Sequence, residues 1–128
     1  KSYGNVIDVF LPKKQLKKQV MGIVTDSTPL EDPKDPEACH VYALYKLLAS
    51  SEQTEELAAK YRAGNFGYGH AKTALLKLIL AEFSEARERF DYYMAHPDEI
   101  SKALKIGADK ARPIAQATLG RVREKLGF

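Results

Sequence analysis

The side chains best suited to a chemical role in this sequence are the basic ones near its two ends. Residues 1–25 hold five Lys against one Asp, and residues 101–128 hold seven Lys and Arg against two acidic residues. The intervening stretch has eight basic and fourteen acidic residues, so it is acidic. If the two ends pack together, they form a basic face that attracts a polyanion such as a nucleic acid. The alternative is a set of ordinary solvated helix faces.

Residues that are typical of enzyme centres are few and scattered. His40, His70 and His96 lack the spacing to Cys39 or to carboxylates that a zinc site needs, so no metal site is predicted. Cys39 lies near the start of an expected helix, where a buried structural thiol is favoured over a reactive one. Three glycines between residues 64 and 69 fit neither the dinucleotide nor the Walker spacing, which favours a turn over a phosphate-binding loop.

Tyrosines form the other notable group. Six of them could stack on unpaired bases, although the rim of a helical core is their commoner place: Tyr42, Tyr45, Tyr61, Tyr68, Tyr92 and Tyr93.

Helices must position all of these side chains, because apolar residues recur at three- and four-residue spacing and no strand pattern of useful length occurs. The spacing predicts helices from Pro12, over 36–49, over 52–62 with Ser51 as N-cap, over 69–95, and from Asp98 to the end. Gly64 and Asn65 end the third helix, and Pro113 predicts a kink or break in the last. In that last helix eight positions are expected to face inward: Ile100, Leu104, Ala108, Ala111, Ala115, Leu119, Val122 and Leu126. The fold class is therefore all-α, a bundle of about five helices with short loops.

Length and composition limit the chain to one globular domain. It has 128 residues, of which 45% are hydrophobic, and a single cysteine that cannot form an internal disulfide. This predicts an intracellular, cytoplasmic protein. The longest apolar stretch, 74–81, is too short to cross a membrane, so no membrane association is expected. Because residue 1 is Lys rather than Met, we expect the chain to be part of a longer protein.

Four segments, in order along the chain, resemble one enzyme family. Residues 1–5 (KSYGN) look like the end of the KMSKS loop of class I aminoacyl-tRNA synthetases. Residues 23–27 (IVTDS), 66–72 (FGYGHAK) and the final segment from Gly107 are similar to the C-terminal part of bacterial tryptophanyl-tRNA synthetases.

The resemblance implies a whole protein that attaches tryptophan to its tRNA with ATP and Mg²⁺ and works as a homodimer. Its Rossmann catalytic domain would lie outside this chain, which is therefore expected to be inactive alone. Residues 1–11 would be the end of the KMSKS loop and a connector, and 12–128 a helical domain that recognises the tRNA anticodon. In the loop, Lys1 would contact the triphosphate and Ser2 and Asn5 would hold the loop.

No RNA-binding motif transfers residue by residue, so the candidates for tRNA contact come from charge and aromatic character. They are Lys13, Lys14, Lys17, Lys18, Lys110, Arg112, Arg121 and Arg123 for phosphates, and Tyr61, Phe66 and Tyr68 for stacking on bases. Two alternatives stay open: the equivalent segment of a tyrosyl-tRNA synthetase, and a non-catalytic helical module that binds a protein.

Overall fold

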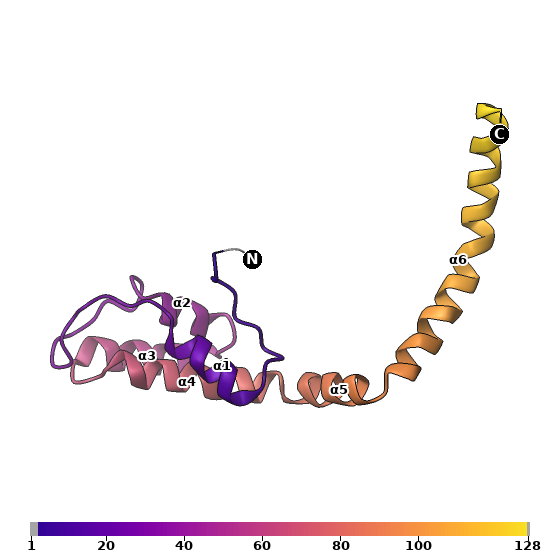
Figure 1. The fold of residues 1–128 in the computed structure, drawn as a ribbon. Coiled ribbons are helices and arrows are strands. Elements are labelled where there is room, and N and C mark those ends of the chain that lie inside the picture. Colours follow the sequence, from indigo (N-terminus) through magenta and orange to yellow (C-terminus); the bar gives the residue numbers. More distant parts are fainter. Residues whose placement is uncertain (1–2, 128) are drawn as a thin grey trace. The chain divides into compact units, whose positions relative to one another are not determined.

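The structure, a computed structural model, describes residues 3–127, and within them it contains six α-helices and no strands. The helices are α1 (Lys13–Met21), α2 (His40–Lys46), α3 (Ser51–Ala63), α4 (Tyr68–Glu82), α5 (Ser84–Ala95) and α6 (Pro97–Leu126), labelled in Figure 1. The predicted all-α class is confirmed, with one helix more than expected. The chain divides into two compact units, Lys1–Arg87 and Glu88–Phe128.

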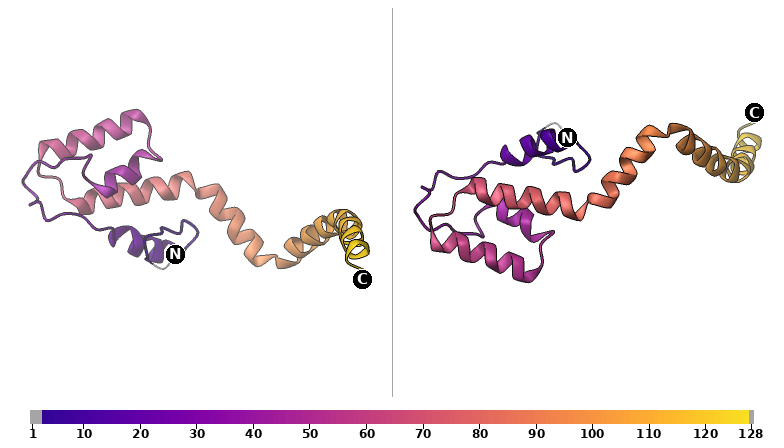
Figure 2. Two further views of the ribbon diagram at one scale, coloured as in Figure 1. Left: turned by 90° about the horizontal axis from the view of Figure 1, so that it is seen from above. Right: turned by 90° about the horizontal axis from the view of Figure 1, so that it is seen from below.

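The buried core lies in the first unit, where α4 packs against α1 and α2, and α2 packs against α3. Figure 2 shows these helices side by side from two directions. Each helix contributes its apolar stripe, and Leu16 and Val20 of α1 are fully buried. Further core residues come from the other three helices: Val41, Tyr42, Leu57, Ala58, Tyr61, Ala71, Leu75, Leu76 and Ile79.

Helix α3 begins one residue earlier than predicted, because its N-cap is Ser50 rather than Ser51. The Ser50 hydroxyl accepts a bond from the Gln53 backbone N–H (3.2 Å), and the Gln53 side chain accepts one from the Ser50 N–H (2.9 Å). This reciprocal pair is a capping box. The predicted end at Gly64 and Asn65 is confirmed, since both have positive φ angles, 75° and 54°.

The single helix predicted over 69–95 is two helices, α4 and α5, that meet at Phe83. The Ser84 hydroxyl donates a hydrogen bond to the Ala81 carbonyl (3.0 Å) at this junction. Such a side-chain bond competes with the regular backbone bonds of a helix. The apolar periodicity continues across the junction, which is why the sequence pattern did not reveal it.

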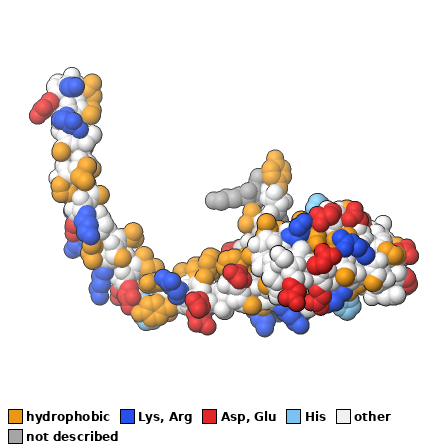
Figure 3. Space-filling model, turned by 180° about the vertical axis from the view of Figure 1, so that it is seen from behind, with side chains coloured by type: hydrophobic (Ala, Val, Ile, Leu, Met, Phe, Trp, Pro, Cys, Tyr) orange, Lys and Arg blue, Asp and Glu red, His pale blue; other side chains and the backbone are white. Residues whose placement is uncertain are grey.

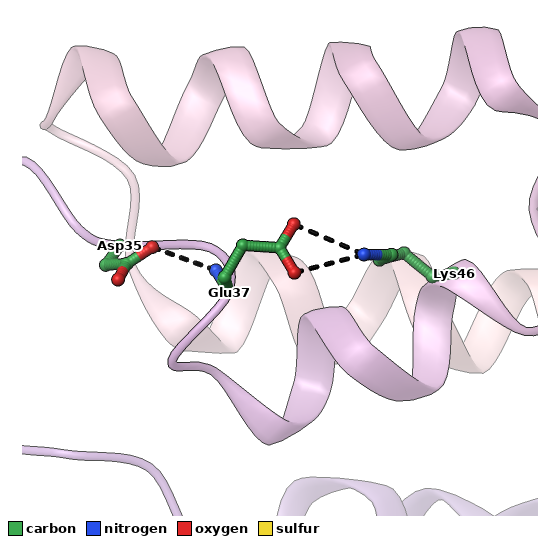
Figure 4. A network of polar contacts seen from close by, with 3 residues as sticks. All are labelled: Asp35, Glu37 and Lys46. Carbon is green, nitrogen blue, oxygen red and sulfur yellow. Dashed lines mark hydrogen bonds and ion pairs between the residues drawn. The ribbon is translucent and has the colours of Figure 1, made fainter.

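The connection between α1 and α2 spans residues 22–39, so the expectation of short loops is wrong here. It also shortens α2, which was predicted to begin at Pro36. Figure 4 shows the contacts at the end of this connection, just before α2. The Asp35 carboxylate accepts a bond from the Glu37 backbone N–H (3.0 Å), and Lys46 pairs with the Glu37 carboxylate (3.0 Å). These polar contacts keep residues 35–39 in a turn before the first helical residue.

Helix α6 continues through Pro113 without a break, and Figure 1 shows it curving along its length. A proline in a helix removes one backbone donor and can bend the helix without ending it. None of the described residues of α6 is buried, and all eight positions expected to face inward are exposed instead. Among the helices of residues 3–127, none is long and apolar enough to cross a membrane.

Candidate nucleic-acid interface

The basic residues predicted near the N-terminus lie on the exposed side of α1. Burial of Leu16 and Val20 fixes the orientation of this helix, so the side chains between them point to solvent. All four predicted lysines are exposed: Lys13, Lys14, Lys17 and Lys18. Together they form the α1 basic face. Within residues 3–127 no ion pair neutralises any of the four, so their charges are available to an anionic partner.

Two cations from later helices hold α1 and the segment before it. The Lys72 ammonium donates to the Met21 carbonyl at the end of α1 (3.1 Å). Arg87 donates to the carbonyls of Val9 and Leu11, the latter at 2.9 Å. A cation at the C-terminal end of a helix binds carbonyls that have no partner within the helix. These two residues therefore position the α1 basic face.

The predicted basic residues of α6 lie in the second unit, on two sides of an apolar stripe. Lys110 and Arg121 are eleven residues apart, which is about three helical turns, so they share one side of the helix. Arg112 and Arg123 have the same spacing and share the other side. All four are exposed, and Arg112 pairs with Asp109 (2.7 Å). Figure 3 shows basic and apolar side chains along the length of this helix.

The three aromatic residues predicted to stack on RNA bases gather at the turn between α3 and α4. The Phe66 and Tyr68 rings lie 5.7 Å and 6.0 Å from the Tyr61 ring. Tyr61 itself is fully buried, and its hydroxyl lies 3.3 Å from the Cys39 sulfur, so burial strongly raises the pKa of this phenol. With no ring face in contact with solvent, Tyr61 is a core residue rather than a stacking residue. Phe66 and Tyr68 are half-buried.

The Tyr68 hydroxyl links two parts of the first unit that are far apart in the sequence. It donates to the Asp26 carboxylate (2.6 Å), which also accepts a bond from the Thr28 backbone N–H (2.9 Å). Burial, together with this bond to a carboxylate, raises the pKa of Tyr68 to about 12. The bond also lowers the pKa of Asp26, because it stabilises the charged form. Tyr68 is therefore neutral and Asp26 anionic at physiological pH.

Lys34 organises the same region and was not recognised from the sequence. Its side chain is buried, and its ammonium donates to the carbonyls of Pro29 (2.6 Å), Leu30 (3.3 Å) and Asp32 (2.9 Å). It also lies 5.6 Å from the centre of the Tyr68 ring, a cation–π distance. A lysine in a proline-rich loop carries no sequence signal of burial, because only the folded loop brings three carbonyls to one point.

The comparisons with known proteins match the whole chain. It is 46% identical over 128 residues to the tryptophan–tRNA ligases of Campylobacter jejuni (strain RM1221) and of Fusobacterium nucleatum. It also superposes on a crystal structure of tryptophanyl-tRNA synthetase from Campylobacter jejuni complexed with ADP and tryptophan, with a TM-score of 0.93, 45% identity and full coverage of this chain. Over its whole length the chain is similar to tryptophan–tRNA ligases. No family model matches it.

The chain spans about 40% of the length of these tryptophan–tRNA ligases, and it corresponds to their C-terminal helical part. The resemblance inferred from residues 1–5, 23–27, 66–72 and the final segment is thereby confirmed. Because the matched relatives are tryptophan enzymes, the tyrosyl alternative is no longer favoured.

Two of the segments typical of the tryptophan–tRNA ligase family meet in the structure. Asp26, in the segment 23–27, accepts the bond from Tyr68, in the segment 66–72. Lys72 closes the second segment and holds the end of α1. These residues thus support the fold of the helical part, whereas the sequence resemblance alone assigned them no role.

Of the three residues expected in the ATP loop, Asn5 is the one that lies within the described residues. Asn5 is exposed and lines, with Gln15, Lys18 and other residues of α1, a cavity of about 970 Å³. Lys1 and Ser2 lie outside the described residues. Residues 3–127 hold no group of three or more His, Cys, Asp or Glu that could bind a metal ion.

Proposed function

We propose that the protein to which this helical part belongs attaches tryptophan to its tRNA in an ATP-dependent reaction. The identity over all 128 residues to tryptophan–tRNA ligases is the observation that carries this proposal. ATP is the co-substrate, Mg²⁺ accompanies its phosphates, and the enzyme acts in the cytoplasm as a homodimer. The chain alone is inactive, because the catalytic domain implied by the family lies outside it.

In this proposal residues 1–11 form the end of the ATP loop and a connector. Lys1 contacts the triphosphate as charge develops on the departing pyrophosphate, and Ser2 and Asn5 hold the loop. A purified chain that supported tryptophan-dependent exchange between ATP and pyrophosphate would contradict the assignment of catalysis to the rest of the enzyme.

Residues 12–128 recognise the tRNA, in particular its anticodon. The α1 basic face and the two basic sides of α6 supply phosphate contacts, which position an RNA without reading its bases. Phe66 and Tyr68 are the remaining stacking candidates of the predicted three, since Tyr61 is buried. The α1 basic face, whose four lysines make no ion pair among the described residues, supports an RNA partner more directly than a protein partner.

Binding of the chain to a tryptophan tRNA transcript tests this proposal. The comparison is the same transcript with its CCA anticodon changed, each at two salt concentrations. We expect tighter binding to the unaltered transcript, and a steep loss of affinity as salt rises, because bound cations release counterions from the phosphates. Equal binding to both transcripts would contradict anticodon recognition. Binding that is insensitive to salt would instead favour the helical protein-binding module.

A further inference from the structure

A groove lies between α3 and α4, on the side of the first unit where α2 packs against both helices. Its volume is about 280 Å³. Pockets for drug-sized ligands hold roughly 300–1,000 Å³, so this groove has room for one small heterocycle. We call it the α3–α4 groove, and its lining includes Tyr45, Gln53, Glu56, Phe66, His70 and Lys77.

One wall of the groove is an aromatic pair whose orientation is set by the core. The Phe66 ring lies 5.7 Å from the buried Tyr61 ring and 5.7 Å from the His70 ring. Phe66 is half-buried and His70 is exposed. A ring held from behind by the core needs no reordering before a planar group stacks on it, which lowers the entropic cost of binding.

The opposite wall, on α3, offers a hydrogen-bond donor beside an acceptor. The side-chain oxygen of Gln53 is taken by the Ser50 N–H, so its amide NH₂ is left to donate. One Glu56 oxygen binds the Lys60 ammonium (2.6 Å), and the other has no partner among the described residues. This bond to Lys60 lowers the pKa of the Glu56 carboxyl and keeps it an acceptor. Gln53 and Glu56 are three residues apart, hence neighbours on the helix surface.

The charge at the rim is positive. Lys60 and Glu56 neutralise each other, whereas Lys77 is exposed and makes no ion pair or hydrogen bond within residues 3–127. Lys77 lies seven residues after His70, about two turns along the same side of α4. An anionic group attached to a ring in the groove can therefore reach an uncompensated ammonium.

We propose that the α3–α4 groove binds a single unpaired base of an RNA strand together with its phosphate. The base stacks on Phe66 and His70, its polar edge meets the Gln53 amide and the Glu56 carboxylate, and the phosphate contacts Lys77. A donor next to an acceptor is what the edge of a nucleobase offers, and stacking on aromatic side chains is the usual way to hold an unstacked base. The inference rests on the proposed RNA-binding function and adds the place where a base is held.

The test is an NMR titration of the isotope-labelled 128-residue chain with a single-stranded RNA hexanucleotide and with the same strand in a duplex. We expect the single strand to shift the amide signals of Gln53, His70 and Lys77, and the duplex to leave them in place. The substitution Lys77→Gln should weaken binding of the single strand about tenfold, as loss of a bond to a charged group does. Arg89→Gln removes one positive charge from an exposed site on α5 that has no part in the proposed RNA contacts, and it should leave the affinity unchanged.

Failure of the groove and failure of RNA recognition give different results. If the α1 and α6 signals shift with RNA while the groove signals do not, the groove proposal is wrong and the RNA-binding function stands. The same holds if Lys77→Gln and Arg89→Gln weaken binding equally. If the chain binds no RNA, the groove is tested by titration with CMP and with ribose 5-phosphate, which has the phosphate but no base. Groove shifts with CMP alone support the base site, and no shifts with either overturn it. A Phe66→Leu variant with an otherwise unchanged spectrum should lose the response to CMP.

Discussion

The hydroxyl of Tyr68, at the first residue of α4, donates a 2.6 Å hydrogen bond to the carboxylate of Asp26, 42 residues earlier in the chain. The bond joins the long connection after α1 to the turn between α3 and α4. Lys34 lies over the ring of the same tyrosine, at 5.6 Å from its centre. One side chain thus links a loop without regular structure to the helical core, and this link leads to a prediction about acid stability.

Replacing Tyr68 with Phe should lower the urea midpoint of unfolding at neutral pH. The bond lowers the pKa of Asp26 in the folded state. Its contribution to the free energy of unfolding is therefore fully present above the unfolded pKa of 3.8. The contribution is lost as the pH falls from that value through the folded pKa. The wild-type chain and Tyr68→Phe should therefore converge in acid. Tyr3→Phe, at an exposed ring, serves as the control and should change nothing. A constant difference between wild type and Tyr68→Phe across this range would contradict the assignment.

Two glycines should respond in opposite ways to substitution by alanine. A Cβ on Gly64 would lie 2.4 Å from the Glu31 carbonyl oxygen, and its φ of +75° strains any L-residue. Gly64→Ala should therefore destabilise the chain by about 1–3 kcal/mol or more. Gly69, in the first turn of α4, has open space around the position that a Cβ would take, so Gly69→Ala should stabilise by about 0.5–1 kcal/mol. Urea unfolding of both variants measures the contrast, and equal signs would refute it.

Loss of the Lys34 ammonium should loosen the connection between α1 and α2. Lys34→Met keeps an unbranched side chain but leaves three carbonyls without their shared donor. A hydrogen bond to a charged group contributes about 1.5–3 kcal/mol, so the global stability should fall by this order. Hydrogen exchange should speed up most at the Lys34 and Asn65 amides, which bond across this junction to Tyr61 and Glu31. If hydrogen exchange instead became uniformly faster in α1 and α4 alone, Lys34 would not hold the connection locally.

Charge removal on α1 should weaken RNA binding without sequence preference. Lys13 and Lys17 are exposed and lie four residues apart on one side of the helix. The double substitution to Gln should lower the affinity for tryptophan tRNA and reduce the salt-dependence slope by roughly 0.7–0.9 for each phosphate that is no longer neutralised. The ratio of affinities for the unaltered and altered anticodon should stay the same, since phosphate contacts carry no base information. An unchanged slope would exclude the α1 basic face from the interface.

Local patterns in the sequence were sufficient for the helical fold class and for the family resemblance. Recurrence of apolar residues at helical spacing determined the all-α class, and the tolerance of Gly64 and Asn65 for positive φ determined the end of α3. Both depend on interactions within a few residues. The four segments pointed to tryptophanyl-tRNA synthetases because all four resemble that family and follow one another in the same order as in its members.

Tertiary structure decided which side chains remain available for function. The sequence does not tell whether Tyr61 and Tyr68 are exposed or buried. Only packing against Cys39 and α2 buries Tyr61 completely. Lys34 is buried because a folded loop brings three carbonyls together, an arrangement no local pattern encodes. The stripe from Ile100 to Leu126 has the periodicity of a buried helix face, yet all eight of its positions are exposed. Periodicity specifies which side of a helix is apolar, whereas burial depends on what packs against that side.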